Sequence, residues 1–460
     1  MKFLGIELSI ENLPELDPGF IPLYKFNQAF LKSARKSVGI AVERAGGEVA
    51  VCSTFIHGTE EMREADHYYI NRLVKTILWL NGGFRIYVCG DEDTCNYLRS
   101  IYCAGGQQEF DWDYMAGVFE HPFEVLLVDA LPPAKDSPKP MGGHMDGCRI
   151  GFDAGGSDRK VSAVIDGETV YSEEVVWFPK LNSDPDYHYE GIVSALKSAA
   201  SHMPRVDAVG VSSAGVFINN RTMSASLFIN VPKELYDAKV KDIYIRAITD
   251  TFGPVPYCVV NDGDVSALAG AISLDETNIL GIAMGTSEAV GYVDEQGRIT
   301  GWLNELAFVP VDANPAAMED EWSHDIGCGV KYFSQDSVIK LAPAAGIELD
   351  PALSPAEKLK AVQSLMEVGD DRAAAIYRSI GVYLAHSLAL YHGLYGFRNV
   401  LLLGRVMSGK GGDTLLASCR KVLENEYPRI YSSINIALPD ERFRRVGQSA
   451  AAASLPEIVR

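Results

Sequence analysis

The sequence from Val259 to Val293, VVNDGDVSALAGAISLDETNILGIAMGTSEAVGYV, decides which fold is expected for this chain. It predicts a buried strand that ends at Asn261-Asp262, a helix of small residues, a second apolar strand, and a turn at Gly285-Thr286-Ser287. A carboxylate at the end of one strand and hydroxyls in a glycine turn at the end of the next suit a site that places a hydroxyl nucleophile beside a phosphate. The stretch therefore indicates phosphoryl transfer.

Length and composition set the class of protein. A chain of 460 residues is too long for one ordinary core, so two or three domains are expected. Hydrophobic residues make up 47% and charged residues 22%, as in a soluble globular protein. The sequence has no apolar run of roughly 18 residues and begins with a poor secretory signal. Its eight cysteines form no Cys-x-x-Cys pair, which favours reduced thiols and a cytoplasmic location.

The charge balance bears on the partners. A net charge of −20 argues against nucleic acid, because a surface that binds DNA needs clustered lysine and arginine to displace the phosphate counterions. Nothing in the sequence favours a membrane as a partner either.

Composition also suggests the domain boundaries. A Pro- and Gly-rich stretch without apolar periodicity predicts a linker over residues 133–148. Before it, residues 1–132 are expected to form a small α/β domain of unknown role. After it, two successive units of hairpin, strand and helix predict two related lobes around a cleft. The lobes are expected at 149–271 and 272–446, with a helix in 447–460 that packs back on the first lobe.

Several elements are predicted by their apolar patterns. Strands are expected at Arg149–Asp153, Ala208–Val211 and Asn399–Leu403, and a helix at Ala238–Phe252. In the first domain, Ser37–Val42 and Glu48–Phe55 are expected to form a hairpin around Gly46-Gly47.

The first candidate site element is the turn Asp153-Ala-Gly-Gly-Ser157, which follows a predicted strand. Gly155 and Gly156 let the backbone approach phosphate oxygens closely, so that its N–H groups become donors, with Ser157 beside them. Asp153 could hold Mg²⁺ through water, because this ion keeps much of its hydration. A plain hairpin turn is the alternative.

The second and third elements come from the opening stretch. Asp262 could accept the proton of a substrate hydroxyl as a phosphoryl group arrives. The alternative is a structural one, in which Asp262 or Asp264 caps the helix Val265–Ile272. In the turn, Gly285, Thr286 and Ser287 could hold β- or γ-phosphate oxygens, or they could form an ordinary hairpin turn.

The fourth element is the loop Gly404-Arg405-Val406-Met407-Ser408-Gly409, which follows a buried strand and precedes a helix. Such a loop can lie against a purine and its ribose. A helix-start loop without a ligand is the alternative.

Together, these four elements resemble the ROK family (repressors, open reading frames and sugar kinases) within the superfamily of sugar kinases, actin and heat-shock chaperones. The resemblance covers Arg149 to Arg460. The D-x-G-G-T loop of the family matches Asp153–Ser157, and its N-D-A-N-A-A-A and G-T-G motifs match Asn261–Ala267 and Gly285–Ser287. The resemblance implies an α/β fold with two ribonuclease-H-like, actin-like ATPase lobes. It also implies that Asp262 is the catalytic base and Asn261 contacts the sugar.

The sugar-binding motifs match in part. The family pattern G-E-x-G-H-x-P-V-D corresponds to Asn304–Asp312, which keeps the sugar-binding Glu305 but has Phe308 in place of the histidine. Where the family has G-C-x-E, this chain has Gly-Cys328-Gly-Val330 and so lacks the sugar-binding glutamate. One cysteine and a nearby histidine are too few for a four-ligand zinc site, so no zinc is expected. The loop on the hexose side, usually G-V-P-G, contains Ser213, a further candidate sugar contact.

This sequence departs from the family pattern in two motifs that are expected to bind the nucleotide. The family pattern G-T-G-I-G-G-G becomes Gly285-Thr-Ser-Glu288-Ala-Val-Gly291, and a glutamate that faces phosphates repels them unless Mg²⁺ lies between. Glu288 is harmless if it points away. In the G-G-G-V-S loop, Arg405 could cover the adenine or fill its pocket.

The resemblance implies an ATP-dependent kinase for a sugar or related polyol, which uses ATP and Mg²⁺ and forms a homodimer. A second hypothesis is a sensor that binds a sugar or nucleotide without turnover, because fold alone does not guarantee activity. The repressor branch of the family carries a helix-turn-helix, whereas the acidic first domain here is predicted to be α/β. Another branch, such as an acetate-kinase-like enzyme or an activator ATPase, is the remaining alternative. Activators of the iron–sulfur type need a cysteine cluster that this sequence lacks.

Overall fold

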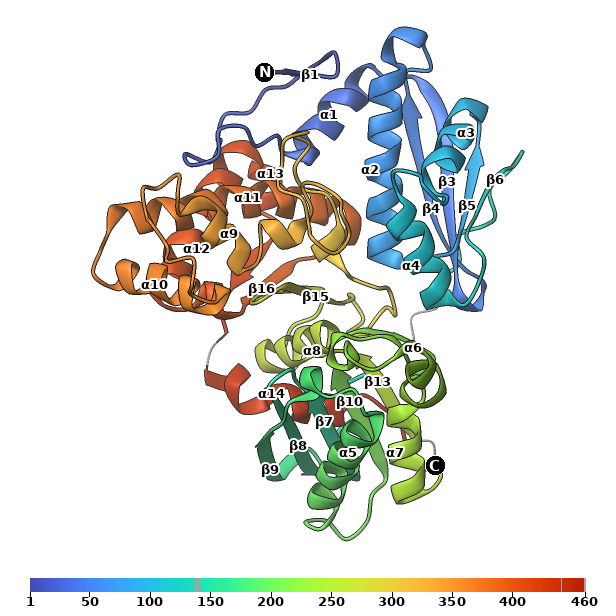
Figure 1. The fold of residues 1–460 in the computed structure, drawn as a ribbon, viewed down its shortest axis with the longest axis vertical. Helices are drawn as coiled ribbons and strands as arrows, with labels where there is room; N and C mark the ends of the chain where they lie inside the picture. Colours follow the sequence, from blue (N-terminus) through green and yellow to red (C-terminus); the bar gives the residue numbers. More distant parts are fainter. Residues whose placement is uncertain (137–140, 440, 459–460) are drawn as a thin grey trace. The chain divides into compact units, whose positions relative to one another are not determined.

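The computed structural model describes residues 1–136, 141–439 and 441–458, so part of the predicted linker, 137–140, lies outside the described residues. The chain divides into two compact units. The first unit contains Met1–Ser137, Ile282–Val290 and Trp302–Ala437, and the second contains Pro138–Gly281, Gly291–Gly301 and Leu438–Arg460. Within the described ranges, no helix has the length and hydropathy needed to cross a membrane. Each unit is thus assembled from segments that are far apart in the sequence (Figure 1).

The second unit is built on a five-stranded sheet with the order β13-β10-β7-β8-β9. Its strands are β7 (Cys148–Ala154), β8 (Asp158–Ile165), β9 (Glu168–Val176), β10 (Ala208–Ser213) and β13 (Tyr257–Asn261). The first three pair antiparallel, whereas β10 runs parallel to both β7 and β13. Every residue of β7 and β10 is buried, as expected for strands that are covered on both faces. The strands predicted at Arg149–Asp153 and Ala208–Val211 are confirmed.

Helices cover the two faces of this sheet. One face carries α5 (Pro185–Ala200) and α7 (Ile243–Phe252), and the other carries α8 (Asp262–Leu274) and α14 (Glu441–Ala453) (Figure 1). The helix predicted over Ala238–Phe252 is wrong in its first part, because a π-helical turn at Tyr236–Val240 precedes α7. A small hairpin of β11 (Val216–Ile218) and β12 (Arg221–Ser224) and the short helix α6 (Lys233–Leu235) complete the unit.

Two neighbouring glycines let α14 pack against the sheet. Gly151 on β7 and Gly210 on β10 are direct partners in the parallel register. A Cβ atom on Gly151 would overlap the carbonyl oxygen of Ser449, and one on Gly210 would overlap that of Ala452. The backbone of the helix therefore lies directly on the backbone of the sheet, which only glycine permits.

The substitution Gly210→Ala is expected to lower the free energy of unfolding by at least about 1–3 kcal/mol, because the new methyl group forces α14 away from the sheet. Urea unfolding followed by circular dichroism measures this loss. Gly393→Ala is the matched control, since no atom lies within 4 Å of its added Cβ. Alanine in that helical position should stabilise the protein by about 0.5–1 kcal/mol. Equal stability of Gly210→Ala and the unaltered protein would contradict the packing described here.

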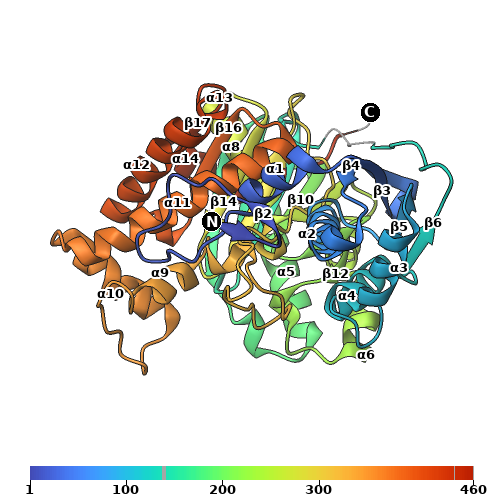
Figure 2. The same cartoon turned by 90° about the horizontal axis from the view of Figure 1, so that it is seen from above.

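The first unit contains a four-stranded sheet with the order β15-β14-β16-β17. Its strands are β14 (Ile279–Met284), β15 (Glu288–Val293), β16 (Asn399–Leu403) and β17 (Asn435–Ala437), and β14 and β15 each continue into the second unit. The helices that accompany it are α9 (Gln335–Leu341), α10 (Pro355–Glu367), α11 (Asp371–Tyr395), α12 (Gly409–Glu426) and α13 (Pro428–Tyr431). Figure 2 shows α11 and α12 side by side, and Gly381 provides the close approach, because a Cβ there would overlap the carbonyl of Leu415. The strand predicted at Asn399–Leu403 is confirmed.

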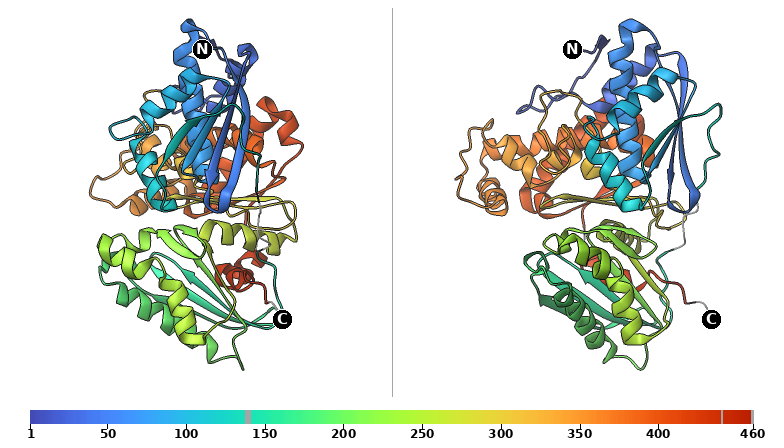
Figure 3. Two further views of the ribbon diagram at one scale, coloured as in Figure 1. Left: turned by 90° about the vertical axis from the view of Figure 1, so that its right-hand side faces the viewer. Right: turned by 45° about the vertical axis from the view of Figure 1, so that its right-hand side comes forward.

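The N-terminal part of the first unit has its own sheet, with the order β4-β3-β5-β6. It follows β1 (Lys2–Phe3), β2 (Ile6–Glu7) and α1 (Leu23–Ser33), and its strands are β3 (Lys36–Arg44), β4 (Glu48–Ile56), β5 (Arg85–Cys89) and β6 (Glu124–Leu127). The predicted hairpin is present, because β3 and β4 pair from end to end around Gly46-Gly47. The helices α2 (Arg63–Asn81), α3 (Glu92–Ile101) and α4 (Glu109–Phe119) lie together on one side of this sheet (Figure 3).

Hydrogen bonds that involve backbone groups join this N-terminal part to residues 304–313 of the same unit. The amide of Ile21 donates to Asp312 Oδ1 over 2.9 Å, and the amide of Leu23 donates to the carbonyl of Val311 over 3.0 Å. At the end of α2, the carbonyls of Leu80 and Trp79 accept from the amides of Asn304 and Glu305, each over 3.0 Å. The segment that contains the candidate sugar contact Glu305 is therefore held by the N-terminal part of the chain.

A buried cluster of charges reinforces the same connection. Lys75 on α2 is fully buried, and its Nζ lies 2.9 Å from Asp111 Oδ2 and 3.1 Å from Asp325 Oδ2. Arg72 lies one turn earlier and donates to both oxygens of Asp325 over 3.1 Å. Burial alone would raise the pKa of Asp325, but the charges of Arg72 and Lys75 hold it well below its usual value. These two cations therefore favour the ionised form of Asp325, although little of its side chain is exposed.

Candidate active site

Three strand ends of the second unit align to form the core of the candidate site. The parallel register pairs Asp153 on β7 with Ser212 on β10, and Ser213 on β10 with Asn261 on β13. The Ser212 hydroxyl donates a hydrogen bond of 2.6 Å to Asp153 Oδ1, and both side chains are buried. The carboxyl ends of parallel strands are where α/β folds generally bind ligands.

The pKa values of Asp153 and Asp262 are both raised. The pKa of Asp153 is raised to about 6, mainly by burial; the Ser212 hydrogen bond lowers it and the nearby charge of Asp262 raises it. Asp262 is the first residue of α8 and keeps some contact with solvent, yet burial of its carboxyl group raises its pKa as well. Two carboxyl groups with raised pKa values, 109 residues apart in the sequence, thus lie at the ends of strands of one sheet: Asp153 on β7 and Asp262 directly after β13.

The helix cap at this point belongs to Asn261 rather than to Asp262. Asn261 Oδ1 accepts from the amide of Gly263 over 2.7 Å, and Asn261 Nδ2 donates to the carbonyl of Gly215 over 2.8 Å. Asp264 Oδ1 instead accepts from the amide of Tyr292 over 3.2 Å. The structural alternative, that Asp262 or Asp264 caps a helix from Val265, is therefore wrong, because α8 begins three residues earlier. The Asp262 carboxylate is not required for capping.

The other candidate sugar contact in this unit is fully buried. Ser213 Oγ lies 2.8 Å from the hydroxyl of Tyr244, which comes from α7. This hydrogen bond holds the Ser213 hydroxyl in place. Ser213 follows Ser212, the strand partner of Asp153, and pairs with Ala154.

The turn after Asp153 connects β7 and β8 and is held by a residue that the sequence did not single out. Trp177 Nε1 donates to the carbonyl of Gly155 over 2.8 Å, and the Trp177 amide donates to the carbonyl of Ser157 over 3.1 Å. A Cβ on Gly155 would lie 2.7 Å from the carbonyl of Asp158, whereas Gly156 and Ser157 are exposed. The turn is therefore a tight hairpin whose tip is open to solvent. This geometry is compatible with a phosphate-binding loop and also with a plain hairpin turn.

In the first unit, the turn after β14 has a similar form. The Gly285 amide donates to the carbonyl of Ser287 over 2.9 Å, while Thr286 and Ser287 are exposed. Gly404 follows the neighbouring strand β16 with a φ of 92°, and a Cβ there would overlap the backbone of Met284. Arg405 then opens a 3-10 turn with an exposed side chain, and its carbonyl accepts from Gln363 Nε2 over 2.7 Å. These two loops are brought together by adjacent strands.

Glu288, the residue that departs most from the family pattern, points into the protein. It is 3% exposed, and neither carboxyl oxygen has a hydrogen-bond partner among the described residues. Oε2 lies so close to Gly329 that a Cβ there would be 2.5 Å from it. Burial, together with the charge of Glu305, raises the pKa of Glu288 well above its usual value. The buried site therefore favours the protonated, uncharged form of this side chain.

The substitution Glu288→Gln is expected to change how stability depends on pH. Below the pKa of a free glutamate, both the folded and the unfolded chain hold the proton, so burial costs little. Above it, only the folded protein keeps the proton, so the free energy of unfolding falls with rising pH by up to about 1.4 kcal/mol per unit. Glutamine removes this contribution, so the variant should gain stability over the unaltered protein between pH 5 and 8. Urea unfolding across that range, with Glu295→Gln in an exposed turn as the control, measures the difference. Parallel curves for Glu288→Gln and the unaltered protein would refute it.

The remaining positions of the sugar and zinc motifs are used in packing. Phe308 lies 4.5 Å from Trp79 and 4.8 Å from Trp322, measured between ring centroids. Cys328 is buried, and burial raises the pKa of its thiol far above its usual value. His324 is exposed, with Nδ1 3.1 Å from Glu319. Across the described part of the chain, no group of three or more His, Cys, Asp or Glu residues is arranged to hold a metal ion.

Comparisons with known proteins identify the fold. No family model matches the sequence, and no curated protein is significantly similar to it. Among solved structures, a ROK hexokinase from Thermus thermophilus matches with a TM-score of 0.52 and 18% identity, covering 66% of this chain and 96% of the hexokinase. A ROK family transcriptional regulator, a homologue of the E. coli MLC protein, matches with a TM-score of 0.54 and 15% identity, covering 68% and 78%. The chain has the ROK fold.

The ROK fold confirms the predicted α/β class and its actin-like ATPase architecture. Because an enzyme and a regulator both share it, the ROK fold alone does not separate catalysis from regulation. About one third of the chain lies outside either match.

Proposed function

We propose that this chain is an ATP-dependent kinase of the ROK family that phosphorylates a hydroxyl group of a sugar or related polyol. The observation that carries the proposal is the pair Asp153 and Asp262, whose pKa values are both raised at aligned strand ends. Perturbed carboxyl groups that are not needed for packing or capping are typical of functional sites.

In this proposal, Asp262 accepts the proton of the substrate hydroxyl. A general base works best when its pKa lies near the operating pH, and burial moves the pKa of Asp262 in that direction. Asn261, which caps α8 and is anchored to Gly215, fixes the start of the helix that carries the base. Asn261, Ser213 and Glu305 are the proposed contacts to the sugar.

Asp153 is the proposed anchor for Mg²⁺. Only one Asp153 oxygen accepts the Ser212 hydrogen bond, so the other oxygen could bind the ion. Mg²⁺ commonly takes one or two carboxylates, with water and phosphate oxygens as its other ligands, and a single carboxylate at this position therefore suits it. Bound there, Mg²⁺ would neutralise charge on the transferred phosphoryl group. With a pKa of about 6, Asp153 is mostly ionised at neutral pH. The proposed contacts to nucleotide and phosphate are Gly155, Gly156, Ser157, Gly285, Thr286, Ser287, Gly404 and Arg405.

A phosphorylation screen tests the proposal. The purified full-length chain is incubated with ATP, Mg²⁺ and a panel of sugars, amino sugars and polyols, and ADP formation is measured together with the phosphorylated product. We expect product with at least one member of the panel and much less ADP in its absence. ADP formation that no panel member stimulates would count against the kinase.

A sensor without catalysis is the second candidate. It is favoured by Phe308, which occupies the family's histidine position and packs against Trp79 and Trp322. Calorimetric titration with ATP and Mg²⁺ separates the two functions in one respect: a kinase must bind ATP at millimolar concentrations. A sensor for sugar alone would show no ATP binding but would still bind a sugar.

A further inference from the structure

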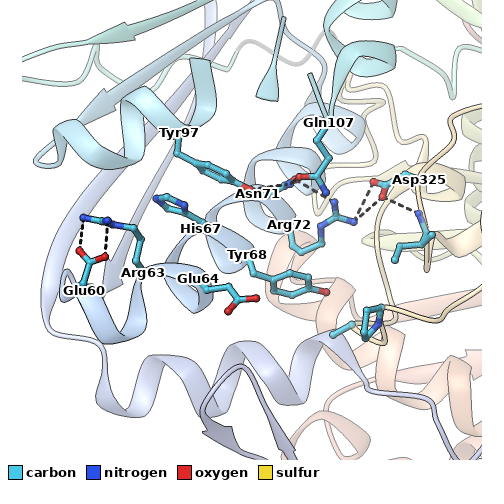
Figure 4. A pocket seen from close by; sticks show the side chains of 13 residues that line it. Glu60, Arg63, Glu64, His67, Tyr68, Asn71, Arg72, Tyr97, Gln107 and Asp325 are labelled. Atoms are coloured by element: carbon cyan, nitrogen blue, oxygen red, sulfur yellow. Dashed lines mark hydrogen bonds and ion pairs between the residues drawn. The ribbon is translucent and has the colours of Figure 1, made fainter. Parts of the chain in front are cut away.

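A cavity of about 650 Å³ lies within the first unit, outside the strand ends that carry the proposed chemistry. One face of α2 lines it with Arg63, Glu64, His67, Tyr68, Asn71 and Arg72. Figure 4 shows these side chains together with Tyr97 of α3 and with Gln107 and Asp325 from two loops. The volume is within the range of sites that bind small molecules.

The wall of this cavity is organised by hydrogen bonds. Asn71 is 2% exposed, and its Nδ2 donates to the Tyr97 hydroxyl over 3.4 Å and to Gln107 Oε1 over 3.3 Å. The Tyr97 ring stacks on His67 with 4.0 Å between ring centroids and an interplanar angle of 8°. His67 Nε2 is in turn 2.9 Å from Asp93 Oδ2. Asn71 therefore holds both Tyr97 and Gln107 in place, and His67 supports the Tyr97 ring.

Polar groups remain available in the cavity after these bonds are counted. Among the described residues, the Tyr97 and Tyr68 hydroxyls and the Gln107 amide NH₂ find no acceptor, and the Glu64 carboxylate finds no donor. Neutral donors from several elements, one acceptor and flat aromatic rings together match the alternating hydroxyls and apolar faces of a sugar or polyol.

The charges of the lining argue against an anionic ligand. Both arginines are already paired, because Arg63 contacts Glu60 over 2.8 Å and Arg72 contacts Asp325 over 3.1 Å. Glu64 adds a carboxylate without a counterion among the described residues. A phosphate group would therefore meet more negative than positive charge and no unpaired arginine.

We propose that this cavity is a second ligand site, for an uncharged mono- or disaccharide or polyol, and that its occupancy is transmitted along α2 to Glu305. The same helix that lines the cavity ends in the carbonyls of Trp79 and Leu80, which accept from the amides of Glu305 and Asn304. Arg72 and Lys75, on successive turns, both hold Asp325, which itself lines the cavity. An occupant that fixes the first half of α2 therefore also restrains residues 304–305. The site does not depend on whether the chain is a kinase.

Hydrogen exchange of the full-length protein, measured by mass spectrometry, tests this proposal without an activity assay. The probes are D-glucose, N-acetyl-D-glucosamine, maltose and sorbitol at millimolar concentrations, with D-glucose 6-phosphate as the charged comparison. We expect at least one uncharged probe to slow exchange several-fold in residues 92–107 and in residues 304–308. We also expect the phosphorylated sugar to bind roughly tenfold more weakly at the cavity than glucose.

Two variants locate the effect. Gln107→Ala changes an exposed residue and should fold normally, and Tyr97→Ala removes the stacked ring. Both should abolish the protection at 92–107 and, with it, the part of the protection at 304–308 that comes from the cavity rather than from sugar bound at Glu305. Asn96→Ala is the matched control, because Asn96 is exposed on the same helix and does not line the cavity. No protection with any uncharged probe, or equal protection in both variants, would overturn the site. Protection at 92–107 without a change at 304–308 would refute the transmission along α2, and tighter binding of the phosphorylated sugar would refute the ligand class.

Discussion

Replacing Asp262 with asparagine should lower kcat for phosphoryl transfer by about 10²–10⁴-fold, because the amide cannot accept the proton of the attacking hydroxyl. The fold should survive, since Asn261 and not Asp262 caps α8. Steady-state rates with the best substrate of the phosphorylation screen measure the effect, and the KM for ATP should change little. The control is Asp275→Asn, which alters an exposed aspartate at the other end of the same helix.

The dependence of the phosphoryl-transfer rate on pH is an independent test of Asp262 as the general base. Burial raises the pKa of Asp262, so the rate of the unaltered enzyme should fall as the pH drops through that value and the base becomes protonated. The Asp262→Asn enzyme should lose the limb of the pH profile that belongs to this group. A variant that retains its rate within a few-fold would show that Asp262 is not the base.

Replacing Lys75 with methionine should lower the free energy of unfolding by about 3–5 kcal/mol, which is the usual effect of removing one partner from a buried ion cluster. Lys75 is fully buried between Asp111 and Asp325, so its loss leaves Asp111 without its cation. Urea unfolding measures the loss. Lys135→Met is the control, because Lys135 is about half exposed and its contact with Glu48 is 3.8 Å long, a surface pair of small expected worth.

The loss should shrink at low pH. Burial already raises the pKa of Asp111, and without Lys75 this carboxyl group would take up a proton more readily still, which reduces the uncompensated charge. A Lys75→Met protein as stable at pH 7 as the unaltered one would mean that the ion pair with Asp325 does not stabilise the contact between α2 and that residue.

The sequence patterns located the strands well, because apolar runs such as Asn399–Leu403 can be buried only within a covered sheet. The sequence patterns did not predict three helices of the N-terminal part, namely α1, α3 and α4. In α3 the signal existed, since Asp91 precedes it and accepts from the amide of Thr94, while Cys95, Leu98 and Ile101 recur on one face. In α4, aromatic and acidic residues alternate without a clear helical period, so only the packing against Lys75 and Trp79 explains the position of Asp111.

For the candidate site, local motifs were enough to select Asp153 and Asp262, but not their neighbours. Ser212 lies beside Asp153 because of the register between β10 and β7, and Trp177 binds the turn through hydrogen bonds. Both are distant from the turn in the sequence, so no local motif identifies them. The direction of Glu288 was likewise open, because the backbone pattern of a strand end does not say which face is buried. The structure turns it towards Gly329.

The hydrogen bond between Ile21 and Asp312 spans 291 residues, and the one between Asn12 and Glu426 spans 414. Translation at about 5–20 residues per second would synthesise Asp312 roughly 15–60 s after Ile21. During that interval the face of α2 that carries Arg72 and Lys75 emerges from the ribosome without Asp325, its later counterion. Such separated contacts raise the contact order, which slows folding. The N-terminal part of this protein is therefore synthesised first, but it can complete its contacts only after residues 312–426 have left the ribosome.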